Sequence, residues 1–396
     1  MSDEHSRAYR GWRMVAVCFA VATLAWGFGF YGQGVYLAHL IAVHGWSLSL
    51  VSGAVTGFYF VSALMVAFVA DWIARFGAPR VIAGGMIATG AASATLGLLR
   101  EPWQLYAAYL LMSLGWASTS LAAITTVLGM WFSARRGLAV SLALTGASAG
   151  GILVVPALQV LIEARGFTNA MLIGGALLAC VGAPLALWLI ESPATPPPPA
   201  ARPAAHGKAA LLRSFRFWSI AGAFAIVWVT QTAFLTHEIN IFSPALGATG
   251  AAAAVAATTF AAVAGRLVLG AVVDRLDKRL TTTLSVSSQA AALVALALWP
   301  EPAVIWATAV VYGLSVGNVI TLPALIVQHE FEPHAFGATV ALLTSVTQMF
   351  GAFGPALLGF GRDLAGGYSV PIICCSLLNV CAGAAVVLLK PGVRPS

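Results

Sequence analysis

Long apolar segments separated by short polar ones fill almost the whole chain. A helix that crosses a bilayer needs roughly 20 apolar residues. The segments that reach this length are 12–40, 47–71, 80–99, 102–131, 136–162, 167–190, 216–242, 249–273, 280–299, 302–328, 335–361 and 369–389. The pattern therefore predicts an all-α integral membrane protein with twelve transmembrane helices in the lipid bilayer.

The composition supports this class and excludes others. Of the 396 residues, 60% are hydrophobic and only 8% are charged. A soluble domain has about 45–50% apolar and about 25% charged residues. We therefore exclude a water-soluble enzyme and a nucleic-acid-binding protein, although the net charge is +7.

The basic residues predict the orientation of the spans. Sixteen of the 20 Lys and Arg residues fall in segments that lie inside if the N-terminus is inside, and three fall in outer loops. Such an asymmetry follows the positive-inside rule and places both termini in the cytoplasm. Because arginine and alanine are far commoner than lysine, we expect a bacterial source and hence the inner membrane.

A proline-rich segment divides the chain into two parts. Six prolines lie within 191–212, which we interpret as a cytoplasmic linker because such a stretch is extended rather than helical. Six predicted spans precede it in 1–190, and six follow it in 213–396. The two parts share a pattern at an offset of 198 residues, in which Gln33, Tyr36 and His39 match Gln231, Phe234 and His237. We infer two pseudo-symmetric six-helix halves, a plan typical of transporters.

Two loops carry a motif that resembles the major facilitator superfamily. The loop after the eighth span reads Gly270-Ala-Val-Val-Asp274-Arg275, a good copy of the family's Gly-x-x-x-Asp-Arg motif. The loop after the second span has Arg75 and Arg80, but Asp71 lies one turn earlier than the motif's aspartate. In this family the motif holds the cytoplasmic side closed. The resemblance implies a cytoplasmic gate, for which the candidates are Asp71, Arg75, Arg80, Asp274, Arg275 and Arg136.

A narrower resemblance points to the monocarboxylate transporters and the bacterial oxalate:formate antiporter. It rests on 131–139 (Trp-Phe-Ser-Ala-Arg-Arg-Gly-Leu-Ala) and on 265–270 (Gly-Arg-Leu-Val-Leu-Gly). In those relatives the arginine that matches Arg266 binds the substrate carboxylate. The chain departs from them at Ala262, where the animal transporters have an aspartate, and it has no lysine in the eleventh span. With one cation in the predicted site, we expect the substrate to be a monoanion rather than a dianion.

Among the Lys and Arg residues, Arg266 alone lies in the interior of a predicted span rather than at its end. It lies eight residues before Asp274, about 12 Å from the end of the helix at 1.5 Å per residue. A charge at the bilayer centre costs at least about 2.5–3.5 kcal/mol, so such a residue is a functional candidate. A guanidinium grips a carboxylate with two parallel hydrogen bonds. The alternative is a structural ion pair or an arginine bonded to backbone carbonyls.

Neutral polar residues complete the predicted substrate site, and ionisable ones predict a coupling site. The neutral candidates are Gln33, Tyr31, Tyr36, Asn318 and Gln348. Each of them could instead connect helices by hydrogen bonds. The coupling candidates are Glu238, His237 and His39 near the predicted outer ends of their spans. Glu238 is the one carboxylate that we expect near the outer half of a span, and histidine titrates near neutral pH. A wetted helix end is the alternative.

The sequence therefore predicts a secondary active transporter of small organic anions, a monocarboxylate moved with a proton by alternating access. We expect a monomer and no cofactor, with a proton gradient or substrate exchange as the driving force. No nucleotide-binding loop, metal cluster or catalytic set is apparent, so we do not expect an enzyme. Efflux of amphiphilic drugs or metabolites by the same fold is the alternative. A sensor or scaffold that binds a solute without turnover is a third possibility.

Overall fold

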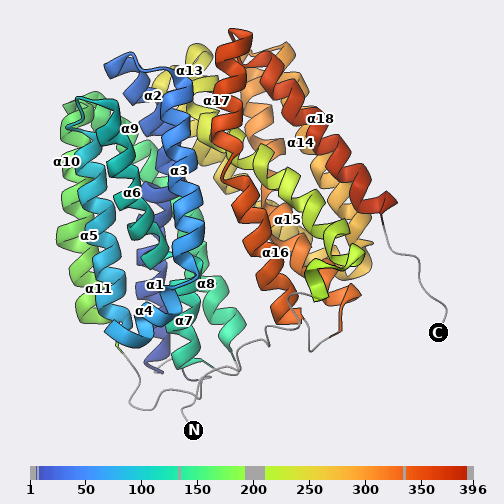
Figure 1. Cartoon of the computed structure of the whole chain (residues 1–396), viewed down its shortest axis with the longest axis horizontal. Helices are drawn as coiled ribbons and strands as arrows, with labels where there is room; N and C mark the ends of the chain where they lie inside the picture. The colour runs from blue at the N-terminus through green and yellow to red at the C-terminus, as the bar shows by residue number, and fades with distance from the viewer. Residues whose placement is uncertain (1–5, 7–8, 133–134, 192–209, 333–335, 390–396) are drawn as a thin grey trace. The chain divides into compact units, whose positions relative to one another are not determined.

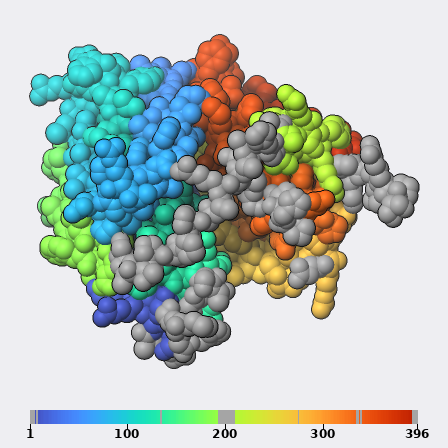
Figure 2. Space-filling model, turned by 60° about the horizontal axis from the view of Figure 1, so that its bottom comes forward, coloured from blue at the N-terminus to red at the C-terminus, as the bar shows by residue number. Residues whose placement is uncertain are grey.

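The computed structural model describes residues 6, 9–132, 135–191, 210–332 and 336–389, without the side chains of 274, 337 and 338. Throughout these ranges the regular elements are helices. The chain divides into two compact units (Figures 1 and 2), and each is described by itself. Unit 1 comprises 1–199 and 248–256, and unit 2 comprises 200–247 and 257–396.

Each of the twelve predicted segments is largely helical over its described residues. The helices of unit 1 are α1 (Gly11–Trp26), η1 (Gly27–Tyr31), α2 (Gly32–His44), α3 (Leu48–Val66), α4 (Val69–Phe76), α5 (Ala78–Leu96), α6 (Pro102–Thr119), α7 (Leu121–Trp131), α8 (Arg136–Ala149), η2 (Gly150–Val154), α9 (Val155–Arg165), α10 (Phe167–Leu177), η3 (Leu178–Gly182) and α11 (Ala183–Leu189). Unit 2 contains most of α13 (Phe215–Val272) and all of η4 (Val273–Arg275), α14 (Lys278–Leu298), α15 (Pro302–Glu330), α16 (Phe336–Gly351), α17 (Gly354–Ala365) and α18 (Ser369–Leu388).

Local sequence signals set several of these boundaries. Ser47 is the N-cap residue of α3, and its hydroxyl accepts a hydrogen bond from the backbone N–H of Leu50 at 3.2 Å. Asp277 caps α14 in the same way, and its carboxylate accepts hydrogen bonds from two backbone N–H groups at 2.9 Å. Pro302 opens α15, where the missing N–H has no intrahelical acceptor in any case. The two polar caps, Ser47 and Asp277, lie between apolar segments, as the hydrophobic pattern requires.

The longest helix, α13, is broken at Gly247. This residue has φ 70° and ψ 171°, a conformation open to glycine and strained for other residues. A continuous helix of 58 residues would be about 87 Å long, far more than the roughly 30 Å of a hydrocarbon core. The break therefore separates the segments 215–246 and 248–272, which match two of the predicted spans.

Ten helical runs of the described residues are long and apolar enough to cross a membrane, with α13 counted once. They do not include α5, which has 19 residues and is rich in Gly, Ala, Ser and Thr. The twelve crossings and the two six-helix halves stay predictions.

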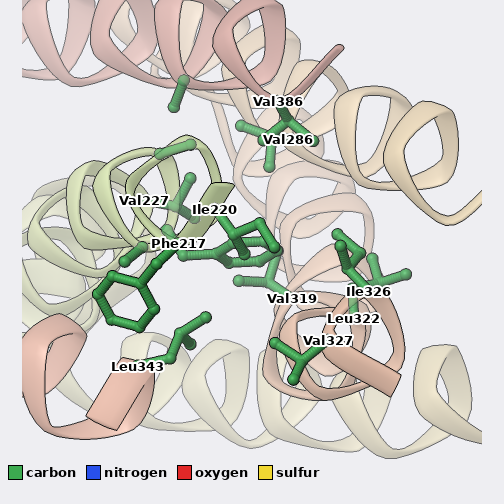
Figure 3. Close-up of a cluster of buried hydrophobic side chains, with 14 of the residues drawn as sticks. Phe217, Ile220, Val227, Val286, Val319, Leu322, Ile326, Val327, Leu343 and Val386 are labelled. Carbon is green, nitrogen blue, oxygen red and sulfur yellow. The ribbon is translucent and has the colours of Figure 1, made fainter. Parts of the chain in front are cut away.

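The core of unit 2 is a cluster of aliphatic and aromatic side chains (Figure 3). Phe217, Ile220 and Val227 of α13 contribute to it, together with side chains from α14, α15, α16 and α18. The neighbouring helices α14 and α18 run side by side (Figure 1). The outward surface is apolar as well, with Leu267 and Leu364 each at least 70% exposed. A surface of this kind suits lipid rather than water.

A buried ion pair ties four helices of unit 2 together at one end. Arg279 of α14 is 2% exposed and donates to both carboxylate oxygens of Glu330 on α15, at 2.6 and 2.9 Å. Its other hydrogen bonds go to Ser219 of α13 at 3.1 Å and to the backbone carbonyl of Val386 on α18 at 2.5 Å. Arg216 lies 3.8 Å from the same carboxylate. The guanidinium is thus paired and bonded, as a buried charge must be.

Candidate functional site

Arg266 lies in the second part of α13, among small residues that allow close helix packing. A side-chain carbon at Gly265 would overlap the backbone of Leu314 on α15, and one at Gly317 would overlap the backbone of Ala262. The backbones of α13 and α15 therefore touch beside Arg266. The arginine itself is partly buried, and its Nε is buried without a hydrogen bond to the described residues, although the side chain has other interactions.

Asn318 follows the Gly317 contact on α15. Its amide nitrogen donates to the hydroxyl of Ser285 on α14 at 3.2 Å, and its carbonyl oxygen is buried without a hydrogen bond to the described residues. Gln348 of α16 is exposed. Arg266 and Asn318 therefore lie on two neighbouring helices of unit 2 whose backbones are in contact, α13 and α15.

Three predicted site residues of unit 1 lie at the π-helical segment η1. Gln33 is fully buried, and its amide donates to the carbonyl of Gly29 at 2.8 Å. The hydroxyl of Tyr36, also fully buried, donates to the carbonyl of Phe28 at 3.0 Å. A π-helical turn interrupts the regular hydrogen-bond ladder, and these two side chains bond to its carbonyls. Tyr31 is partly buried at the end of η1. A substrate contact for these three residues stays a prediction.

His237 is fully buried in unit 2 and bonded through both ring nitrogens. Nε2 lies 3.0 Å from the backbone carbonyl of Pro355 on α17, and Nδ1 lies 3.0 Å from the hydroxyl of Tyr368. Tyr368 lies in the turn before α18, where desolvation raises the pKa of its hydroxyl, so that the hydroxyl keeps its proton. The histidine joins α13 to α17 and to the start of α18.

Glu238, the next residue, is 1% exposed. Its Oε1 accepts a hydrogen bond from the hydroxyl of Thr258 at 2.5 Å, and its Oε2 is buried without a hydrogen bond to the described residues. Thr258 lies beyond the break at Gly247, so the second part of α13 returns alongside the first. The sequence offered no sign of Thr258 as a partner, because Thr is common throughout the spans.

His39 of α2 has a different environment in unit 1. Its Nδ1 lies 3.0 Å from the carbonyl of Val35 in its own helix, and its ring stacks on Phe167 with centroids 5.5 Å apart. Glu163 of α9 interacts with it electrostatically. The expectation that Glu238 is the one carboxylate in this part of the spans was wrong, because α9 continues to Arg165 and includes Glu163.

Glu163 is bonded to one residue of its own helix and to one residue of α13. It accepts hydrogen bonds from the side-chain amide of Gln159 at 3.1 Å and from the hydroxyl of Thr249. It is exposed, unlike Glu238.

The predicted gate residues lie mostly on the surface. Asp71, Arg75 and Arg80 are exposed on or beside α4, and Arg275 is exposed in η4. Arg136 is exposed and donates to the carbonyl of Thr125 at 3.4 Å. The side chain of Asp274 lies outside the described residues. The buried pair of Arg279 and Glu330 was not predicted from the sequence, although Arg279 lies four residues after Arg275, the last residue of the second motif. Among the described residues no group of three His, Cys, Asp or Glu could hold a metal ion.

Comparisons with known proteins agree with this architecture. The human monocarboxylate transporter 11 is 31% identical over 304 residues, which cover 72% of this chain and 63% of the human protein, less than two thirds of its length. The mouse monocarboxylate transporter 11 is 29% identical over 340 residues, covering 81% of this chain and 74% of the mouse protein.

Solved structures show the same fold at low sequence identity. A bacterial homologue of the human lysosomal transporter Spinster, inward-facing and occupied, matches with a TM-score of 0.80 and 16% identity, covering 97% of each chain. The nucleoside transporter NupG matches with a TM-score of 0.79 and 12% identity, covering 96% of this chain and 98% of its own. The sequence profile of the Major Facilitator Superfamily matches residues 16–355. The chain is therefore a multi-pass membrane transporter that belongs to the Major Facilitator Superfamily.

Proposed function

We propose that this transporter moves a small monocarboxylate together with a proton by alternating access. The observation that carries the proposal is Arg266, a partly buried arginine within a membrane-spanning helix. A guanidinium stays charged throughout a transport cycle and binds a carboxylate through two parallel hydrogen bonds. The relatives named above are monocarboxylate transporters, which supports the same substrate class.

The anion and the arginine neutralise each other in this mechanism. A lone charge is costly to enclose in a dry site, and a paired charge is less so. Binding of the carboxylate to Arg266 therefore lowers the barrier to closing the protein around it. Gln33, Tyr31, Tyr36, Asn318 and Gln348 are the proposed neutral contacts.

A proton taken up with the anion would keep the loaded transporter electrically balanced. The candidate groups are Glu238, His237 and His39. The proposed cytoplasmic gate comprises Asp71, Arg75, Arg80, Asp274, Arg275 and Arg136. We place the protein in a bacterial inner membrane as a monomer with both termini in the cytoplasm, its halves at 1–190 and 213–396.

A thermal-shift screen of purified protein tests the proposal. The panel contains short monocarboxylates, dicarboxylates and amphiphilic drugs, each tested on the wild type, on Arg266→Gln and on Arg165→Gln as an exposed control. A ligand that binds only the folded state stabilises it by about 2.7 kcal/mol at a hundredfold excess over its Kd. We expect a shift with monocarboxylates that Arg266→Gln loses and Arg165→Gln keeps. Shifts with amphiphilic drugs alone, unchanged in Arg266→Gln, would instead establish drug efflux.

A further inference from the structure

We propose that the coupled proton resides on one buried carboxyl site, formed by Glu238 with Thr258 and Tyr312, and that His237 is a neutral positioning residue that does not take up this proton. The coupling of this proton to transport rests on the proposed function. The protonated carboxyl itself does not, because it follows from the surroundings of Glu238.

The first step is the missing countercharge. Glu238 is 1% exposed, and none of its interactions within the described residues is with a basic side chain. A carboxylate removed from water without a paired cation is strongly disfavoured, and it takes up a proton instead. The buried pair of Arg279 and Glu330 in the same unit is the contrast, because there the carboxylate has a guanidinium at 2.6 Å.

The second step is the set of groups around the carboxyl. Thr258 occupies Oε1, and a hydroxyl can either donate or accept a hydrogen bond. Tyr312 of α15 is also fully buried, and it interacts electrostatically with Glu238. Its ring packs on Phe234, one helical turn before Glu238, with centroids 4.5 Å apart. Glu238 Oε2 and the Tyr312 hydroxyl are both buried without a hydrogen bond to the described residues. Oε2 of the carboxyl is therefore open to one proton.

The other ionisable groups nearby bring no cation to Glu238. Cys375 of α18 lies near Tyr312, and Tyr368 binds His237. Asp363 interacts with His237 and is paired with Arg362 at 3.3 Å on an exposed part of α17. Arg266 lies eight residues beyond Thr258, about 12 Å along the same helical stretch. At that distance an anion bound to Arg266 can change the proton affinity of Glu238 through its field without touching it.

The third step concerns His237. The carbonyl of Pro355 can only accept a hydrogen bond, so Nε2 carries the hydrogen. The other nitrogen, Nδ1, can then accept the hydrogen of the Tyr368 hydroxyl. The neutral ring satisfies both partners, and it positions α13 against α17 and the start of α18.

Infrared difference spectroscopy on purified protein in lipid tests the assignment without any substrate. We expect the C=O band of a protonated carboxyl at neutral pH in the wild type, its loss in Glu238→Gln and its retention in the exposed control Glu163→Gln. Thr258→Val should shift the band, because it removes the hydrogen bond to Oε1. The band should remain in Tyr368→Phe, which disturbs His237 and leaves Glu238 intact.

The absence of this band from the wild type, or its persistence in Glu238→Gln, would overturn the assignment. Monocarboxylate uptake that moves protons equally in the wild type and Glu238→Gln would overturn the assignment and leave the proposed function standing. If the band behaves as expected but the protein binds no monocarboxylate, the assignment to Glu238 stands and the proposed function is overturned.

Discussion

The sequence pattern shared by 33–39 and 231–237 produces two different structures. His39 is partly buried and bonds to a carbonyl of its own helix. His237, at the matching position, is fully buried and bonds to residues of α17 and of the turn before α18. The motif is the same, and its surroundings decide what each histidine does.

Two arginines at the starts of the helices that follow the two motif loops, α5 and α14, differ in the same sense. Arg80 is exposed, whereas Arg279 is 2% exposed and bonds to three other helices. At these two pairs of positions, the residue in unit 1 hydrogen-bonds within its own helix or is exposed, and the residue in unit 2 hydrogen-bonds to other helices. Removal of matched residues from the two units can break or sharpen this contrast.

The largest difference is expected between the two carboxylates. Glu238→Gln should abolish proton movement during monocarboxylate uptake, because an amide cannot take up and release the proton. Glu163→Gln should leave proton movement close to wild type, because Glu163 is exposed. A pH-sensitive dye inside proteoliposomes measures both. Equal losses in the two variants would show that the environments are less different than their burial indicates.

The next difference concerns the two arginines. Arg279→Met leaves the Glu330 carboxylate buried without its main partner, and we expect it to lower the free energy of unfolding by about 3–5 kcal/mol. Arg80→Met should change it by no more than about 0.5 kcal/mol, as is usual for an exposed residue. Unfolding by denaturant in detergent provides the comparison. A small effect of Arg279→Met would contradict a structural role for the pair.

The histidines should differ by a smaller amount. His237→Leu leaves a buried carbonyl and a tyrosine hydroxyl without their partner, and we expect a loss of about 2–4 kcal/mol. His39→Leu removes one bond within a helix at a partly exposed site, so we expect less than about 1 kcal/mol. Unfolding by denaturant measures both variants. Similar losses of the free energy of unfolding in His237→Leu and His39→Leu would refute the difference between the two histidines.

The smallest effect is expected from Tyr368→Phe. It removes one of the two hydrogen bonds of His237, which is worth about 1 kcal/mol, and leaves the bond to Pro355 in place. The double variant with His237→Leu should then be less destabilised than the sum of the two single ones, because both remove the same bond. Full additivity would show that the bond contributes nothing.

The apolar pattern located the helices because each span must hide its backbone from lipid, and that requirement is written into contiguous residues. It did not locate the π-helical segments. The π-helical segments η1, η2 and η3 lie inside uniformly apolar runs, so hydropathy has no signal for them. The interval between the predicted spans 216–242 and 249–273 contains Gly247, so the pattern placed this break, but it could not show which residue adopts the positive φ.

In the candidate site, too, some residues could be singled out from the sequence and others could not. Arg266, His237 and Glu238 could be found from sequence because ionisable residues are rare in lipid-facing segments. Their partners could not, because Thr258, Pro355 and Tyr368 lie 20, 118 and 131 residues away along the chain and belong to common residue types. Burial, which separates Glu238 from Glu163, depends on those distant contacts.

The hydrogen bonds of Arg279 also carry a consequence for the order of synthesis. Its partners are Ser219, made 60 residues earlier, Glu330, made 51 residues later, and the carbonyl of Val386, made 107 residues later. While the ribosome is still producing α16 and α17, the guanidinium lacks its last acceptor. The final helix therefore completes the hydrogen bonding of this guanidinium, and a chain that ends before α18 leaves it with Glu330 and Ser219 but without the Val386 carbonyl.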